Sequence, residues 1–371
     1  MRILVDYRPA VRRRTGVGEY MHELTRAYAG AFDDAVTVFT SSWKDRPSPH
    51  LQRELRADVV DRRIPVRVLN YLWHRREWPP IEWLAGDYDV VHSAHPLLIP
   101  SRRAAQVVTI HDLFFMQAPD RTQAEIRRDY PQLTPAHARR ADAIVTPSAY
   151  TGRLVQAFGV PAERIHVCSL GAPRWQTLGS GPNLPPDGCV LFMGTLEPRK
   201  NVGLLLDAYE RLTQRLSDVP ELILAGGASP DAAPWLDRIH RAPLAGRVRH
   251  IGYVPHEERE ACYARARVLV LPSLDEGFGL PVLEAMSAGI PVVVSNRGAL
   301  PEVVGDAADL VDASDADGLA VALERLLTDR EWAECRARAG LARAATFTWD
   351  RTAANLRAAY QTAVEHRARR R

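Results

Sequence analysis

The chain has 371 residues, which is enough for two domains of ordinary size. Its content of 46% hydrophobic and 25% charged residues is that of a globular protein and excludes a disordered one. The formal net charge of +3 is too small to indicate a nucleic-acid-binding protein, and no partner of that kind is expected.

Cysteine spacing and the length of the apolar runs indicate the cellular compartment. The four cysteines are scattered without C-x-x-C spacing, which argues against both a zinc site and a disulfide framework. The first apolar run is too short for a signal peptide. No segment approaches the ~18 apolar residues that are needed to span a bilayer. These features predict a cytoplasmic protein with reduced thiols.

Short apolar runs alternate with helical patterns from end to end, which predicts parallel sheets with helices on both faces. In the first half, strands are expected at 3–5, 36–39, 90–92, 107–110, 143–146 and 165–168. Residues 173–187 are rich in Gly and Pro and are expected to form a linker. In the second half, strands are expected at 190–193, 222–225, 248–251, 268–271, 292–295 and 309–311.

The predicted fold class is therefore α/β, with two Rossmann-like doubly wound parallel-sheet domains facing across a cleft. The first domain is expected to cover residues 1–172 and the second residues 188–348. From Trp349 onward, apolar residues recur at helical spacing. Residues 349–371 are expected to form a helix that packs back onto the first domain.

Two features of the first half point toward a ligand. His111 follows the strand at 107–110, and ligands bind at the carboxyl ends of strands in open α/β sheets. A lone histidine is more often structural, but the neighbouring Asp112 makes the two interpretations about equally strong. Gly16 and Gly18 follow a long loop that contains Arg8 and Arg12–Arg14, and they open a helix whose free N–H groups would face the cleft.

A basic pair stands near the start of the second half, in the stretch Gly194-Thr-Leu-Glu-Pro-Arg-Lys-Asn201. Arg199 and Lys200 lie between a strand and a helix. Cations are mildly unfavourable beside the positive end of a helix dipole, so this placement favours an anionic ligand such as a pyrophosphate. The alternative is a solvated helix entry.

Two glutamates frame a glycine-rich loop in Ser273-Leu-Asp-Glu-Gly-Phe-Gly-Leu-Pro-Val-Leu-Glu284. Glu276 is expected in the loop after the buried strand at 268–271, and Glu284 inside a helix at 280–288 that Gly289 ends. Gly277 and Gly279 allow the backbone to come close to a ligand. This arrangement suits hydrogen bonds to the hydroxyls of a sugar or a ribose, whereas Glu276 alone would indicate a solvated acidic loop.

A weaker signal follows the strand at 248–251. The backbone at Tyr253 and Val254 could meet a planar base, although a plain strand followed by a helix cap explains the pattern equally well.

Several other classes of site are disfavoured. A nicotinamide fingerprint needs a third glycine where Met21 stands, and it needs an acid after the second strand. The chain has no G-x-x-x-x-G-K-[ST] loop and no G-x-S-x-G elbow. It also has no paired acidic metal motif. We therefore expect no metal and no bound cofactor.

Aromatic and basic residues interleave between positions 70 and 84, where Trp73, Trp78 and Trp83 accompany His74, Arg75 and Arg76. Such a segment suits the headgroup level of a bilayer, which would give peripheral contact with the inner membrane. The alternative is an amphipathic helix that covers the core and breaks at Pro79 and Pro80.

Together these motifs resemble the family 4 retaining glycosyltransferases (glycosyl transferases group 1), which have the GT-B fold. The resemblance covers nearly the whole chain and rests on four stretches: Asp6-Tyr-Arg-Pro with Thr15-Gly-Val-Gly-Glu-Tyr20, Ile110-His-Asp112, Gly194–Asn201, and the E-x7-E pattern from Glu276 to Glu284. One departure is Glu19, which stands where many relatives carry Arg. The first and third stretches resemble the mannosyl- and rhamnosyltransferase branch of polysaccharide assembly.

The resemblance implies a nucleotide-sugar donor on the second domain and a glycan or lipid-linked acceptor on the first. Arg199 and Lys200 would hold the diphosphate, with His111 and Glu276 as further catalytic residues. The remaining donor-binding residues implied are Gly16, Gly18, Thr195, Tyr253, Val254, Gly277, Phe278, Gly279, Leu280 and Glu284. A nucleotide-sugar epimerase or sugar phosphorylase, and a sugar-nucleotide binding protein without turnover, are the alternatives.

Overall fold

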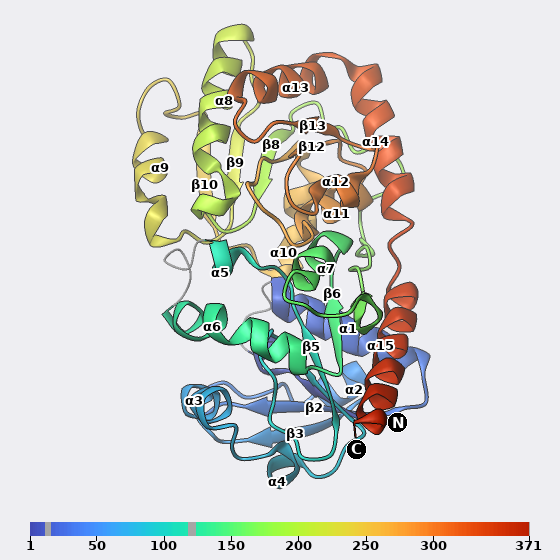
Figure 1. Ribbon diagram of the computed structural model, residues 1–371. Helices are drawn as coiled ribbons and strands as arrows, with labels where there is room; N and C mark the ends of the chain where they lie inside the picture. Colours follow the sequence, from blue (N-terminus) through green and yellow to red (C-terminus); the bar gives the residue numbers. More distant parts are fainter. Residues whose placement is uncertain (12–15, 118–123, 371) are drawn as a thin grey trace. The chain divides into compact units, whose positions relative to one another are not determined.

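The computed structural model describes residues 1–11, 16–117 and 124–370, leaving aside the side chains of residues 124–126. The chain divides into two compact units (Figure 1). Unit 1 comprises Met1–Gly171 and Thr348–Arg371, and unit 2 comprises Ala172–Phe347. Arg12, Arg13, Arg14 and Thr15, which the sequence places before the first helix, lie outside the described residues.

Unit 1 is built on a seven-stranded parallel sheet in the order β3-β2-β1-β4-β5-β6-β7. Its strands are β1 (Arg2–Asp6), β2 (Ala35–Ser41), β3 (Asp58–Arg62), β4 (Val90–Ser93), β5 (Ala105–Thr109), β6 (Ala143–Thr146) and β7 (Ile165–Val167). The helices are η1 (Arg8–Ala10), α1 (Gly16–Ala31), α2 (Leu51–Leu55), α3 (Val66–Arg76), α4 (Ile81–Ala85), α5 (Phe114–Gln117), α6 (Ala124–Arg140), α7 (Ala149–Gln156), η3 (Ala162–Arg164) and α15 (Trp349–Arg369).

Unit 2 repeats the plan with a six-stranded parallel sheet in the order β10-β9-β8-β11-β12-β13. Its strands are β8 (Cys189–Met193), β9 (Leu222–Ala225), β10 (Val248–Gly252), β11 (Ala266–Leu271), β12 (Val292–Ser295) and β13 (Asp309–Val311). The helices are η4 (Pro198–Lys200), α8 (Val202–Arg215), η5 (Pro230–Ala232), α9 (Ala233–Arg238), α10 (His256–Ala264), α11 (Leu280–Ser287), α12 (Leu300–Val304), α13 (Ala316–Thr328) and α14 (Arg330–Ala344).

The strands in the middle of each sheet are nearly continuous apolar runs because helices cover both of their faces. Every residue of β5 and β8, for example, is buried. All twelve strands expected from the sequence are present. β3 was not predicted, since only two of its residues are apolar and charged residues flank them. It is an edge strand, and charged side chains are tolerated there because one side of the strand meets solvent.

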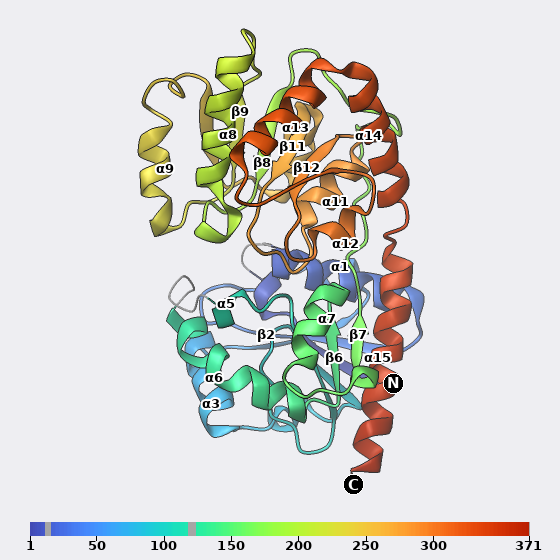
Figure 2. The same cartoon turned by 45° about the horizontal axis from the view of Figure 1, so that its top comes forward.

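The last helix of the chain, α15, belongs to unit 1, which is otherwise formed by residues 1–171. α15 packs against α1, β5, β6 and β7, beside which Figures 1 and 2 show it. Leu356 and Tyr360 are buried on its inner face, and the Tyr360 hydroxyl lies 2.8 Å from Nδ1 of His92 in β4. Residues 173–187 belong to unit 2, where Asn183 bonds to the backbone of Gly289. None of the described helices is long and apolar enough to cross a membrane.

Candidate nucleotide-sugar site

The strand order of each sheet marks the place where a ligand is expected. In unit 1 the order reverses between β1 and β4, and in unit 2 it reverses between β8 and β11. Open α/β sheets bind ligands outside the carboxyl ends of the strands at such a switch point. In unit 2 the loops that leave β8 and β11 carry the basic pair and the first glutamate of the E-x7-E pattern, so both motifs lie at the switch point.

The basic pair is not solvated, contrary to the simpler interpretation of the sequence. Lys200 ends the short helix η4 and is only 7% exposed. Its Nζ donates to Oε1 of Glu276 at 2.6 Å. The Arg199 guanidinium donates to Oε2 of Glu276 at 3.0 Å and to the Asp275 carbonyl at 3.1 Å. The second amino group of Arg199 also donates to Oε1 of Glu197 at 2.8 Å. The loop after β11 therefore fixes both cations.

Glu276 is the centre of this cluster. It is 5% exposed, and its Oε1 also accepts a bond of 2.7 Å from the Ser273 hydroxyl. Burial by itself would raise the pKa of Glu276, but Lys200 and Arg199 outweigh burial and lower the pKa to about 2. The carboxylate is thus ionised at neutral pH and holds both cations in place. The sequence gives Glu276 a sugar-binding role without indicating this second one, because 76 positions separate it from Lys200.

Two glycines allow the loop between β11 and α11 to take its path. Gly279 has φ +103 at the N-cap of α11, and a Cβ there would lie 2.7 Å from Leu300. Gly298 has φ +64, and a Cβ would lie 2.5 Å from the Glu276 backbone nitrogen. Any side chain at position 298 would therefore push the Glu276 loop away. The motif-based prediction includes Gly279 but not Gly298, which is far from the motif in sequence.

Glu284 lies inside α11, as predicted, and has its own set of partners. It is 4% exposed. Arg259 of α10 donates to its Oε1 at 3.0 Å, and the Tyr263 hydroxyl donates to its Oε2 at 2.6 Å. Burial raises the pKa of Tyr263 well above its ordinary value, and the neighbouring carboxylate raises it further, so this hydroxyl remains a donor. No sequence motif indicates Arg259 or Tyr263 as partners of Glu284, because α10 and α11 meet only in the fold.

The remaining predicted donor-binding residues of unit 2 differ in their exposure and in their contacts. Phe278 packs edge-on against Phe347 with ring centroids 5.8 Å apart, so its side chain is structural and its backbone remains for a ligand. Gly277 is buried, Leu280 is partly buried and Thr195 is exposed. Tyr253 and Val254 follow β10, the edge strand of the sheet, and Tyr253 is exposed.

In unit 1, His111 follows β5 as expected. Its Nε2 lies 3.1 Å from the Ala94 carbonyl, which can only accept, so Nε2 carries the proton. Burial lowers the pKa of His111, and the neutral ring offers Nδ1 as an acceptor. The predicted glycine pair does open a helix, since α1 begins at Gly16. A Cβ at Gly18 would lie 2.8 Å from the Pro9 carbonyl, so Gly18 permits close packing on η1.

A buried polar cluster at the unit 1 switch point was not predicted. Asp6 ends β1 and pairs with Arg8 through both oxygens, at 2.8 Å each. His95, which follows β4, places Nε2 3.5 Å from Asp6 and 3.3 Å from Arg8. Burial lowers the pKa of His95 to about 3. Only the pairing of β1 with β4 brings these residues together.

The segment with three tryptophans divides into two parts. Trp73 is fully buried in α3, and His74 is buried beside it. Arg75 is held by Asp129 at 2.6 Å. Trp78 and Trp83, by contrast, are exposed. The break at the two prolines is confirmed, because α3 ends at Arg76 and α4 begins at Ile81. The core-packing interpretation is therefore right for Trp73 and wrong for Trp78 and Trp83.

Two Rossmann-like units, with a cation pair fixed at the switch point of the second, define a glycosyltransferase of the GT-B class. Comparison of the chain with known protein families and proteins agrees with this class. Residues 14–173 match the family Glycosyltransferase Family 4, and residues 182–343 match Glycosyl transferases group 1. The chain is 32% identical to the O-antigen chain mannosyltransferase B of Escherichia coli, over 94% of this chain and 97% of that protein. The chain thus belongs to family 4 of the glycosyltransferases and is an enzyme of that activity.

Solved structures support the fold. Sucrose-phosphate synthase from Thermosynechococcus elongatus has a TM-score of 0.76 at 22% identity, covering 97% of this chain and 98% of its own. The Anabaena protein HepE, solved in complex with UDP-glucose, has a TM-score of 0.71 at 18% identity, covering 96% and 99%. At these identities the likeness shows the GT-B fold and nothing finer.

Proposed function

We propose that this enzyme is a retaining hexosyltransferase that uses a nucleoside-diphosphate sugar. The acceptor is a hydroxyl of a glycan or a lipid-linked sugar in the assembly of cell-surface polysaccharide or glycolipid. The observation that carries the proposal is the cation pair of partly buried Arg199 and buried Lys200, held by Glu276 where the strand order of unit 2 reverses. Fixed cations at this place match the charge of a diphosphate.

The chemistry follows from where charge develops. The bond between the anomeric carbon and the leaving phosphate oxygen breaks, and negative charge grows on the diphosphate. Arg199 and Lys200 are already oriented by Glu276, so they stabilise this charge without reorganisation in the transition state. The acceptor oxygen then bonds to the anomeric carbon on the same face, and its proton passes to the leaving phosphate oxygen. No carboxylate is needed as a base.

The other residues take roles that the family resemblance implies. Glu284 accepts bonds from the ribose hydroxyls, with its orientation set by Arg259 and Tyr263. The backbone from Phe278 to Leu280 contacts the sugar, where Gly279 leaves room for it. His111 contacts the transferred sugar with a neutral ring. These cations meet the phosphate charge, and we infer that transfer requires no bound metal ion.

The sugar is mannose in this proposal, with rhamnose as the other candidate of the same branch. Support comes from the mannosyltransferase of Escherichia coli, which is similar over nearly its whole length. The HepE complex with UDP-glucose shows that the same fold accepts a different donor. The fold alone therefore does not identify the sugar, so the choice of mannose rests on the sequence similarity to the mannosyltransferase.

A thermal-shift panel tests the donor class. Binding to the native state alone raises the melting temperature, so GDP-mannose, dTDP-rhamnose, UDP-glucose and the corresponding diphosphates can be ranked. We expect the strongest shift with GDP-mannose, and label from it should then enter an oligosaccharide acceptor. Loss of donor without any acceptor would instead indicate an epimerase. Strong binding with no turnover on any acceptor would indicate a sugar-nucleotide binding protein.

A further inference from the structure

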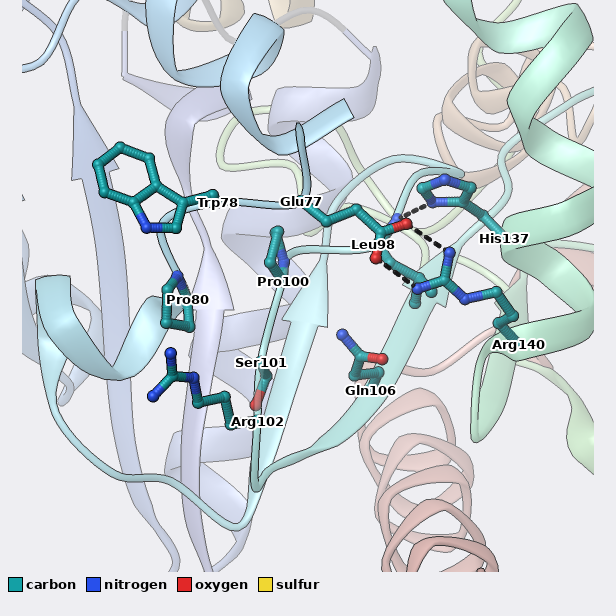
Figure 3. Close-up of a pocket in the computed structure, with 10 residues that line it drawn as sticks. All are labelled: Glu77, Trp78, Pro80, Leu98, Pro100, Ser101, Arg102, Gln106, His137 and Arg140. Atoms are coloured by element: carbon teal, nitrogen blue, oxygen red, sulfur yellow. Dashed lines mark hydrogen bonds and ion pairs between the residues drawn. The ribbon is translucent and has the colours of Figure 1, made fainter. Parts of the chain in front are cut away.

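Unit 1 contains a pocket of about 170 Å³ that has no part in the proposed transfer (Figure 3). It lies between the turn that joins α3 to α4, the connection from β4 to β5, and the end of α6. Gln106, the second residue of β5, lines it, whereas His111 follows the other end of that strand. The pocket and His111 are therefore at opposite ends of β5.

One wall of the pocket is aromatic and open to solvent. Trp78 lines it and is 50% exposed. Trp83, 58% exposed, meets Trp78 edge-on with ring centroids 6.1 Å apart. The Arg102 guanidinium lies 5.1 Å from the Trp83 ring and also lines the pocket. Two large apolar rings are thus held at the surface by each other and by a cation, and exposed apolar surface of this kind marks interaction sites.

The opposite wall is polar and equally well fixed. In Figure 3, Trp78 lies on one side, Arg140 and His137 lie on the other, and Gln106 lies between them. Arg140 and Glu77 form a two-bond ion pair at 2.5 and 2.8 Å. The hydrogen bond from Arg140, which outweighs the effect of burial, lowers the pKa of Glu77, so the pair stays ionised at neutral pH. Both side chains are about half exposed, and they retain bonding capacity for a ligand.

His137 and Gln106 are oriented by backbone groups. The Leu98 N–H donates to Nδ1 of His137 at 2.9 Å, so the proton of the neutral ring lies on Nε2. Burial lowers the pKa of His137 to about 4, so the ring is neutral at pH 7. Gln106 donates its amide N–H to the Ile99 carbonyl at 2.7 Å, which leaves its own carbonyl oxygen as an acceptor. This wall thus carries both fixed donors and fixed acceptors.

We propose that this pocket is a second carbohydrate-binding site, which holds one sugar ring of the glycan acceptor away from the place of reaction. A sugar ring has an apolar C–H face, which packs on an aromatic ring, and an edge of hydroxyls, which both donate and accept. The volume equals that of about six water molecules at ~30 Å³ each, which suits a single ring. The site extends the proposed function, but its binding of sugar needs neither donor nor turnover.

The charge and the burial of the residues around the pocket favour a sugar, rather than a membrane surface, as its ligand. The Glu77 carboxylate stands at the pocket and would repel anionic headgroups, and it neutralises Arg140. Of the basic and aromatic residues in α3, Trp73 and His74 are buried and Arg75 is bound to Asp129, whereas Tyr71 and Arg76 are exposed. A free anion is a poorer fit for the same reason, since the Glu77 carboxylate neutralises Arg140, one of the two arginines that line the pocket. A neutral polyhydroxyl ring uses both walls.

Isothermal titration of the whole protein with mannotriose and with maltotriose, in the absence of any nucleotide, tests the proposal. We expect at least one of them to bind, and Trp78→Ala to weaken that binding by about five- to tenfold, as loss of a ring contact does. Trp43→Ala is the matched control, because Trp43 is exposed in unit 1 and does not line the pocket. It should bind as the unaltered protein does.

Two further measurements separate the possible outcomes. In Trp78→Ala the KM for a long glycan acceptor should rise while the KM for a monosaccharide acceptor stays the same. Failure of both trisaccharides to bind, or equal binding by Trp78→Ala, would overturn the proposal and leave the transferase activity intact. Sedimentation with phosphatidylglycerol vesicles that is lost in Trp78→Ala, together with no trisaccharide binding, would assign the surface to a membrane instead.

Discussion

The ammonium of Lys200 lies 2.6 Å from the carboxylate of Glu276, although 76 positions separate the two residues in sequence. An ammonium has three N–H donors, and this contact uses one of them. The other two N–H donors remain for a ligand, and the bond to Glu276 already sets the direction of the ammonium group. In the proposed transfer, Glu276 therefore acts on the diphosphate through Lys200, in addition to its proposed contact with the sugar.

Replacing Lys200 should damage turnover more than folding. In Lys200→Ala we expect kcat with saturating donor to fall by about 10²–10³, because one fixed charge is lost from the leaving group. Lys44 is the only other lysine of the chain and is exposed, so Lys44→Ala is the matched control. Near-normal turnover in Lys200→Ala would remove Lys200 from the mechanism.

Replacing Glu276 should damage folding as well as activity. Glu276→Gln leaves Lys200 buried without its counter-charge, which should cost about 3 kcal/mol of stability. Glu365→Gln, at an exposed position of α15, should cost almost nothing. Melting temperatures of the two variants provide the comparison, and equal values would contradict the structural role of Glu276.

The same pair predicts a dependence on pH. The folded pKa of Glu276 is about 2 and its ordinary value is 4.5, so its stabilisation is complete above pH 4.5 and is lost as the pH falls toward 2. The difference in melting temperature between the unaltered protein and Glu276→Gln should therefore be constant from pH 7 to pH 5 and shrink below that range. A difference that grows as the pH falls would show that the sign is wrong.

Tyr263 provides a milder test of the ribose site. Tyr263→Phe removes the hydroxyl that donates to Glu284, and a bond to a charged group contributes about 1.5–3 kcal/mol. We expect donor affinity to fall about tenfold or more while kcat at saturating donor changes little, because the ribose is bound equally in the ground and transition states. Tyr71→Phe, at an exposed position, is the control. An unchanged donor affinity would show that the Tyr263 hydroxyl does not position Glu284 for ribose binding.

Transfer should survive a strong chelator. Arg199 and Lys200 already supply the positive charge that a metal ion provides in other phosphate sites. Activity measured with excess EDTA should match activity without it, while a magnesium-dependent transferase treated alongside loses its activity. Loss in EDTA that is restored by magnesium or manganese would show that the two cations are insufficient.

How much the sequence predicted depended on the range of the interactions. The strands at 190–193 and 268–271, and the helix that starts at Leu280, were predicted because burial on both faces leaves a continuous apolar run and glycine ends a helix locally. The strand at 58–62 was missed because its pairing with β2, rather than its own pattern, makes it a strand. In the core-packing interpretation of the sequence, helical spacing turns Trp78 and Trp83 inward, but α3 ends at Arg76, before both of them.

By itself, the sequence determined the fold class, the order of the elements and the motifs that identify the family. These depend on patterns within a few residues, where backbone geometry and apolar periodicity act directly. The tertiary structure alone decided which charges meet: Lys200 with Glu276, Glu284 with Arg259 and Tyr263, and Glu77 with Arg140. The physical reason is that an ion pair needs atoms within about 4 Å, and only the parallel pairing of distant strands and the packing of helices on them set those separations.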